Sequence, residues 1–263
     1  MQPATHCFVI TNVDEYALAN GPGVHFFDPD SPIHKAVRSE KYPLIIELHS
    51  CLKQIGPGAY GFNTGHVFDV DNTDPANVSA ALVHGRKMAA QYRDAFAEHL
   101  PAFANSWLAA TGALLGVRET RRIMGDYVLC LDDFHTRADF DDEIGRYNYP
   151  VDIHAATSSA KDFAKFEQEH TSLRYKDGES YGIPYRTLTP QGLDNVLVAG
   201  RCVSTDRHMQ SSIRVMPGCY ITGQAAGTAA GMAADGGSDV HNLDVPELQA
   251  RLKALGAYLP NAQ

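Results

Sequence analysis

The feature that most constrains the fold lies in the last third of the chain, where a short apolar run precedes a long stretch of small residues. Residues 195–200 read Asn-Val-Leu-Val-Ala-Gly, a continuous apolar run ending in glycine that is typical of a buried parallel strand. After a polar loop, Pro217 opens a segment rich in glycine, alanine and threonine. Because proline is favoured in the first helical turn, this pattern predicts a helix that starts within about two residues of Pro217 and ends near residue 234.

Within that predicted helix, Gly223, Gly227 and Gly231 recur every four residues and therefore share one face. A stripe without side chains lets a helix approach another backbone, or a flat ligand, unusually closely. We therefore expect the stripe to be packed, so that replacing Gly227 with leucine would overfill the contact and destabilise the fold. Gln224 and the threonines make the segment too polar for a membrane-spanning helix.

The composition is that of a folded, acidic protein. Of its 263 residues, 44% are hydrophobic and 20% are charged, which excludes a disordered tail. No apolar run is long enough to span a membrane, and the first residues lack the layout of a signal peptide. The 31 acidic and 22 basic residues give a net charge of -9, which argues against a nucleic-acid partner. Five scattered cysteines without a CxxC pair suggest neither a disulfide framework nor a zinc ribbon, so we expect a cytoplasmic location.

Secondary-structure patterns organise the rest of the chain. Asp74 and Pro75 are a favourable N-cap and first helical residue, and apolar residues at helical spacing follow up to Pro101, which predicts a core-facing helix. Strands are predicted at 7–13, 44–48 and 149–154, a strand-turn-strand unit at 113–134, and helices at 159–170 and 245–256.

The string from residue 193 to residue 230 resembles the C-terminal motif of FAD-dependent oxidoreductases related to the flavoprotein subunits of fumarate reductase and succinate dehydrogenase. Residues 2–14, 116–129 and 149–154 with 183–188 resemble other stretches of that family. The resemblance implies an α/β (α+β) fold: a mixed-sheet substrate (cap) domain over residues 1–185, the C-terminal strand and helix of a Rossmann-like FAD-binding domain over 186–236, and a terminal helix and tail over 237–263.

One departure from the family pattern bears on function. Such flavoproteins begin with a strand-turn-helix that carries GxGxxG and holds the FAD pyrophosphate, but no GxGxxG occurs in this chain. The chain therefore looks like the C-terminal part of a longer enzyme. We expect FAD as cofactor and hydride transfer between a small organic substrate and flavin N5, with a GxGxxG-bearing N-terminal half as partner. The alternative is a non-catalytic remnant, or a subunit that completes a flavin site with another chain.

The resemblance also assigns candidate residues for the cofactor. Reduction of the flavin ring places negative charge near its N1 atom, and a helix N-terminus offers unpaired N–H groups and partial positive charge to such an anion. Arg214 would add a full charge there, or alternatively pair with a surface carboxylate. The predicted cofactor-binding residues are Gly200, Arg201, Ser212, Ile213, Val215, Met216 and Gly218.

Candidate groups for substrate chemistry come from two further segments. Asp152 and His154 occupy alternate positions of a predicted strand, so the carboxylate can orient the imidazole for proton transfer. Arg118 and Arg121 can clamp a substrate carboxylate by bidentate hydrogen bonds, although structural pairing with Glu119 or Asp126 is an equal alternative. We therefore predict His154, Arg118 and Arg214 as the catalytic set, and we expect Arg146 on a solvated excursion.

A metal hydrolase is the remaining enzyme class that the histidines and aspartates suggest. The chain has no HExxH and no tight pair of metal ligands, so we predict no metal ligands. The string at 69–74 superficially suggests a calcium loop, but it lacks the required glycine and the bidentate glutamate. Cys202 and Cys219 are interpreted as small buried apolar residues.

Overall fold

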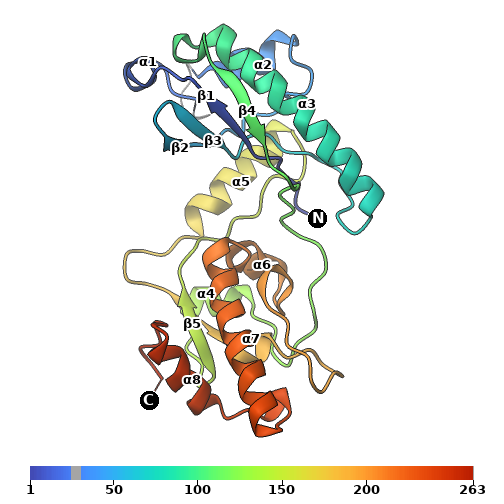
Figure 1. Ribbon diagram of the computed structural model, residues 1–263, viewed down its shortest axis with the longest axis vertical. Coiled ribbons are helices and arrows are strands. Elements are labelled where there is room, and N and C mark those ends of the chain that lie inside the picture. The colour runs from blue at the N-terminus through green and yellow to red at the C-terminus, as the bar shows by residue number, and fades with distance from the viewer. Residues whose placement is uncertain (25–30, 263) are drawn as a thin grey trace. The chain divides into compact units, whose positions relative to one another are not determined.

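The computed structural model describes residues 1–24 and 31–262 and divides the chain into two compact units. Unit 1 consists of Met1–Val117 and Ala155–Phe163, and unit 2 consists of Arg118–His154 and Ala164–Gln263 (Figure 1). The functional domain boundaries that the resemblance implies, at residues 185 and 236, stay a prediction.

Unit 1 is built on a four-stranded sheet with the order β2-β3-β1-β4, in which every neighbouring pair is antiparallel. The expected mixed sheet is therefore wrong for this unit. Residues 44–48, predicted as a strand, form none, because Leu44 N–H donates to the Gln91 side chain and Ile45 N–H closes a turn onto Tyr42. The strands are β1 (Phe8–Thr11), β2 (Leu52–Gly56), β3 (Ala59–Phe62) and β4 (Trp107–Thr111).

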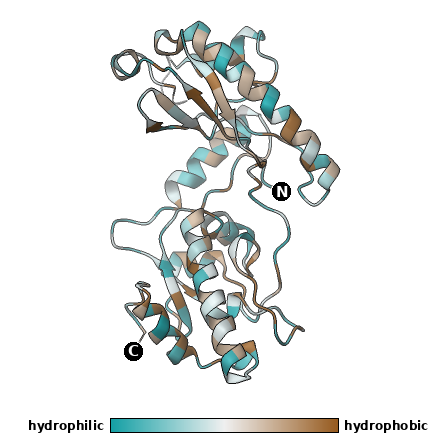
Figure 2. Cartoon of the chain, in the orientation of Figure 1, coloured by the Kyte–Doolittle hydropathy of each residue, from teal (hydrophilic) through white to brown (hydrophobic). Residues whose placement is uncertain are grey.

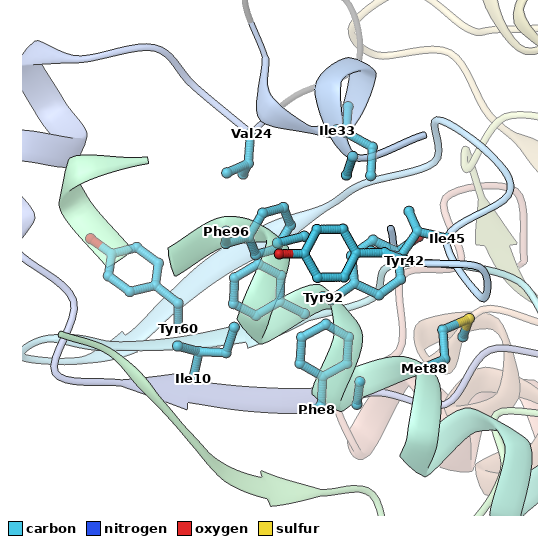
Figure 3. Close-up of a cluster of buried hydrophobic side chains, with 14 of the residues drawn as sticks. Phe8, Ile10, Val24, Ile33, Tyr42, Ile45, Tyr60, Met88, Tyr92 and Phe96 are labelled. Atoms are coloured by element: carbon cyan, nitrogen blue, oxygen red, sulfur yellow. The ribbon is translucent and has the colours of Figure 1, made fainter. Parts of the chain in front are cut away.

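The long helix α3 (Pro75–His99) packs on this sheet and begins where the sequence predicts. The Asp74 side chain accepts a hydrogen bond from Ala76 N–H at 3.0 Å, as an N-cap residue should. Aromatic side chains join the two layers: Phe8 of β1 stacks on Tyr92 of α3 with ring centroids 5.9 Å apart (Figure 3). In the same way, Phe96 of α3 lies 5.6 Å from Phe62 of β3. Two shorter helices, α1 (Glu15–Asn20) and α2 (Pro32–Ser39), and the 3-10 turn η1 (Pro101–Phe103) complete the unit.

Unit 2 has a smaller antiparallel pair, β5 (Glu143–Tyr147) with β6 (Tyr181–Pro184), and a separate apolar core around Tyr181. Arg146 lies on β5 with 8% of its side chain exposed and binds Glu143 and Asp139, both at 2.6 Å. The expectation of a solvated Arg146 is thus wrong, because two carboxylates hold it against the unit. The remaining elements are α4 (Leu131–Thr136), α5 (Ala160–Ser172, which begins in unit 1), α6 (Arg207–Ile213), α7 (Met216–Gly236), α8 (Val245–Ala254), η2 (Tyr185–Thr187), η3 (Gly200–Cys202) and η4 (Val240–Asn242).

Three further segments predicted as strands do not form them. Residues 195–200 are partly exposed coil and turn, and Val198 N–H donates to the carbonyl oxygen of Leu188 at 2.8 Å without a ladder. Segments 113–134 and 149–154 also lie outside the strands of the sheets, and 113–134 makes only isolated bridges such as Leu129 to Thr205. A strand needs a neighbour paired over several residues, and among the described residues these segments have at most single bridges.

Helix α7 starts one residue before Pro217 and extends to Gly236, which confirms the predicted helix. Much of α7 is drawn in pale colours because small residues dominate it (Figure 2). The glycine stripe, however, is not packed: a Cβ placed on Gly223, Gly227 or Gly231 meets no heavy atom within 4 Å. The expectation that leucine at position 227 would overfill a packed contact is therefore wrong, because the described residues leave open space there. No described helix is long and apolar enough to cross a membrane.

Replacing Gly227 with alanine should raise the free energy of unfolding of this chain by up to about 1 kcal/mol, because alanine favours the helix and meets open space. Urea denaturation followed by circular dichroism measures the change. Gly218→Ala on the same helix is the control and should destabilise, since its Cβ would lie 2.4 Å from the carbonyl oxygen of Ile213. A loss of stability in Gly227→Ala would show that the stripe is packed after all.

Candidate functional site around Asp152

Asp152 is the centre of a buried polar cluster in unit 2. Its carboxylate Oδ2 accepts a hydrogen bond from Arg214 at 2.8 Å and lies 3.3 Å from Nε2 of His154. Its other oxygen lies 3.5 Å from Nδ1 of His170. Its backbone N–H donates to the hydroxyl of Ser211 at 3.0 Å, and Ser211 lies on α6. Two predicted catalytic residues, His154 and Arg214, are thus brought to one carboxylate.

The charge state of Asp152 follows from these contacts. Burial alone would raise its pKa, but the contact with His154 and the positive charges around the carboxylate outweigh burial and hold the pKa well below its usual range. Arg214 therefore binds the buried carboxylate of Asp152. The alternative, pairing with a surface carboxylate, is not what the structure shows. Nε of Arg214 is itself buried, with no hydrogen-bond partner among the described residues.

Aromatic stacking fixes the two imidazoles of the cluster. Phe166 on α5 stacks on His154 with centroids 5.3 Å apart and on His170 with centroids 5.6 Å apart. Burial lowers the pKa of His170, against the opposing charge of Asp152. Asp152 and His154 are not on a strand, but the extended coil after β5 still leaves them in contact.

The start of α7 follows directly after Arg214 and carries most of the predicted cofactor residues. Val215 is its N-cap and makes no side-chain cap, while Pro217 occupies the first turn. N–H groups at a helix start have no partner within the helix, so this end of α7 offers backbone donors and partial positive charge. The exposed Met216 and the buried Gly218 lie within that turn.

Gly200 and Arg201 meet the same helix from η3. The N–H of Gly200 donates to the hydroxyl of Thr222 on α7 at 3.0 Å, and Gly200 adopts φ +81°, a conformation that favours glycine. Arg201 is exposed and its charge acts on Cys219, in the first turns of α7. Cys219 is half-buried, and burial raises the pKa of its thiol. Residues 200, 201, 215, 216 and 218 therefore gather around one helix end.

The other three predicted residues lie deeper in unit 2. Ser212 donates to the carbonyl oxygen of Tyr149 at 2.7 Å and is 2.9 Å from the hydroxyl of Tyr181, so its side chain is held within the protein. Ile213 is fully buried in the core. Arg118 is 6% exposed, and its carbonyl oxygen accepts a hydrogen bond from Gln210 on α6. Their roles at a cofactor or substrate stay predictions.

Sequence reasoning missed His170 and Tyr147. His170 reaches Asp152 from a helix distant in sequence, although the spacing of Phe166 and His170, four residues apart, already places both on one helix face. Tyr147 is buried beside the Gly218 backbone, and burial raises its pKa to about 12. Nothing in the local sequence distinguishes it from the tyrosines of the core.

Protonation of His170 should lower the stability as the pH falls from 7 to 5, whereas His241, whose pKa is raised by its contacts with Leu193 and Asp126, acts in the opposite direction. The folded pKa of His170 is below its ordinary value of 6.5, so in this range this residue binds more protons in the unfolded chain than in the folded one. Asp152 adds a further loss near and below its unfolded pKa of 3.8, for the same reason. Urea denaturation at several pH values measures the slope. His170→Gln should flatten it between pH 5 and 7, and an unchanged slope in that variant would contradict the assignment.

The comparisons with known proteins identify one family. Neither the curated proteins nor the solved structures give a significant match. Residues 1–252, which include all of the Asp152 cluster and α7, match the family described as FAD dependent oxidoreductase. A match over nearly the whole chain is decisive: the protein belongs to the FAD dependent oxidoreductase family.

Proposed function

We propose that this protein takes part in flavin-dependent oxidation or reduction of a small organic substrate, with hydride exchanged at flavin N5. The observation that carries the proposal is the position of the Asp152 cluster. Arg214 joins that cluster directly to the start of α7, so a proton-bearing imidazole and a helix-end donor set share one region of unit 2. Family membership supports the same chemistry.

The residues at the start of α7 suit a flavin. Bound FAD would supply the hydride carrier, and the edge of its ring is rich in hydrogen-bond acceptors. The N–H group of Met216 and the Nε of Arg214 would be donors for that edge, with Gly218 packed behind them against Tyr147. Gly200 and Arg201 would lie along the ribityl chain or pyrophosphate, as the resemblance implies.

Asp152 and His154 would together transfer a proton to or from the substrate. Nε2 of His154 faces Asp152, so the carboxylate would orient this imidazole as the group that takes or gives the proton. Asp152 keeps the ring oriented and stabilises its protonated form, because the carboxylate stays ionised in this buried setting. Arg118 is the candidate clamp for a substrate carboxylate.

We further infer that an N-terminal half carrying GxGxxG completes the flavin site. Two exposed features of unit 2 support this: the glycine stripe of α7, open to close approach, and the apolar run 195–200, which lacks strand neighbours among the described residues. The same features support the alternative function, a non-catalytic subunit that completes a flavin site on another chain.

An FAD titration followed by fluorescence quenching tests the proposal. This chain alone should bind FAD weakly, and addition of a GxGxxG-bearing N-terminal half from a family member should give tight, stoichiometric binding. Gly227→Leu should abolish that gain while leaving the chain folded, because a bulky residue on the stripe blocks close docking.

Ala254→Leu, which adds the same side chain at an exposed position of α8 outside the stripe, is the control and should retain the gain. Tight binding by this chain alone would refute the need for a second half. A flavin site that forms but shows no turnover with any substrate would favour the non-catalytic subunit.

A further inference from the structure

Unit 1 contains a pocket that none of the candidate site residues lines. Its volume is about 380 Å³, which is in the range of pockets for small organic ligands. One wall is α3, and the others are formed by residues within 43–46 and 66–70. Leu44, Ile46, Phe68 and Val70 make the lining predominantly apolar.

The α3 wall presents Asn77, Ala80, Ala81 and His84, which share one helix face because they are three and four residues apart. Ala81 is buried at the base, whereas the other three are exposed. Asn77 and His84 therefore provide polar groups beside an otherwise apolar wall, the combination that orients a small ligand in a pocket.

A buried ion pair lies at the opposite wall. Nδ1 of His66, a lining residue, is 2.8 Å from Oε2 of Glu47, and both side chains are at most 4% exposed. His49 stacks on the His66 ring with centroids 4.5 Å apart, and Phe68 meets its edge at 5.6 Å. The ring is therefore rigidly held where it lines the pocket.

The local backbone explains this rigidity. Gly65 N–H donates to the carbonyl oxygen of His49 at 3.1 Å, which ties the two histidine segments together. Gly65 has φ +76°, and a Cβ there would lie 2.8 Å from the Tyr92 ring, so only glycine fits before His66. Buried ionisable pairs are costly to form, and beside a pocket they are typical of binding sites.

Charge decides the class of ligand. The Glu47 carboxylate balances any charge on His66, and Asp69 leaves a negative group at the pocket wall. Asp69 disfavours a carboxylate or phosphate ligand, but it is exposed and screened by solvent, so it would hold a cation only weakly. The apolar remainder of the lining therefore favours an uncharged molecule. The apolar lining favours a hydrocarbon body, and the exposed side chains of Asn77 and His84 favour a hydrogen-bonding group on it.

We propose that this pocket is a binding site for an uncharged organic molecule with an apolar body and a hydroxyl or carbonyl group. Ligand binding in this pocket of unit 1 does not depend on the proposed flavin chemistry. Binding is measured without flavin, so failure of either proposal can be distinguished from failure of the other.

Ligand-observed NMR titration of the full chain with 3-phenylpropan-1-ol tests the site. The alcohol should bind, and 3-phenylpropanoate, its anionic counterpart, should bind at least about tenfold more weakly. Ala80→Phe should abolish binding of the alcohol, because the ring fills the pocket from an exposed position that leaves the fold intact. Val83→Phe on the same helix is the matched control, since Val83 is 51% exposed and does not line the pocket.

Equal binding of the alcohol to wild type and Ala80→Phe would overturn the site, as would an absence of binding to the wild type. Equal or tighter binding of the carboxylate would overturn the ligand class. Thermal unfolding of both phenylalanine variants confirms that each is folded.

Discussion

Replacing Arg214 with alanine is expected to lower the free energy of unfolding by about 3 kcal/mol, because it removes the hydrogen-bonded cation from a buried carboxylate. Asp152 would keep only its two histidine neighbours. Urea denaturation at pH 7 measures the loss. Arg207→Ala is the control, since Arg207 is exposed on neighbouring α6, and it should change stability by less than about 0.5 kcal/mol.

A double variant separates the contribution of the Arg214–Asp152 ion pair to stability from that of side-chain packing. The double variant Arg214→Ala with Asp152→Asn should be more stable than the sum of the two single changes predicts, because the uncompensated charge disappears. Strict additivity of the single changes would show that Arg214 stabilises the fold without Asp152.

Replacing Phe96 with alanine is expected to cost about 3–5 kcal/mol, since the ring is fully buried between α3 and the sheet. Phe96 contacts Phe62, Tyr92 and Phe103, so the cavity would open where the layers of unit 1 join. Denaturation followed by tyrosine fluorescence measures the change. Val83→Ala on the exposed face of the same helix is the control, and equal losses in both variants would place the core of unit 1 elsewhere.

The helices could be predicted from the sequence because their signals are local. The Asp-Pro start of α3 and the Pro-opened run of small residues in α7 each fix a boundary through neighbouring residues alone. The strand predicted at 195–200 failed for the opposite reason. Its apolar residues satisfy a strand pattern, but a strand also needs a partner, and sequence pattern alone does not reveal which one is present.

In the candidate site too, contacts between residues close in sequence could be predicted, and contacts made by tertiary packing could not. Asp152 and His154 are two residues apart, so their contact could be anticipated, and Arg214 was placed next to the helix start by its position in the chain. His170 could not be placed at Asp152, because tertiary packing of α5 brings it there. Arg146 was misjudged because nothing in the local sequence signals that Glu143, three residues before it, is buried and pairs with it.

The reduction potential of bound FAD tests the central claim most directly. We propose that the start of α7 stabilises the negative charge of reduced flavin, so FAD bound to this chain together with a GxGxxG-bearing half should have a higher potential than free FAD. Spectroelectrochemical titration of the flavin absorbance measures it. A potential equal to that of free FAD, or no FAD binding with any such half, would contradict the account.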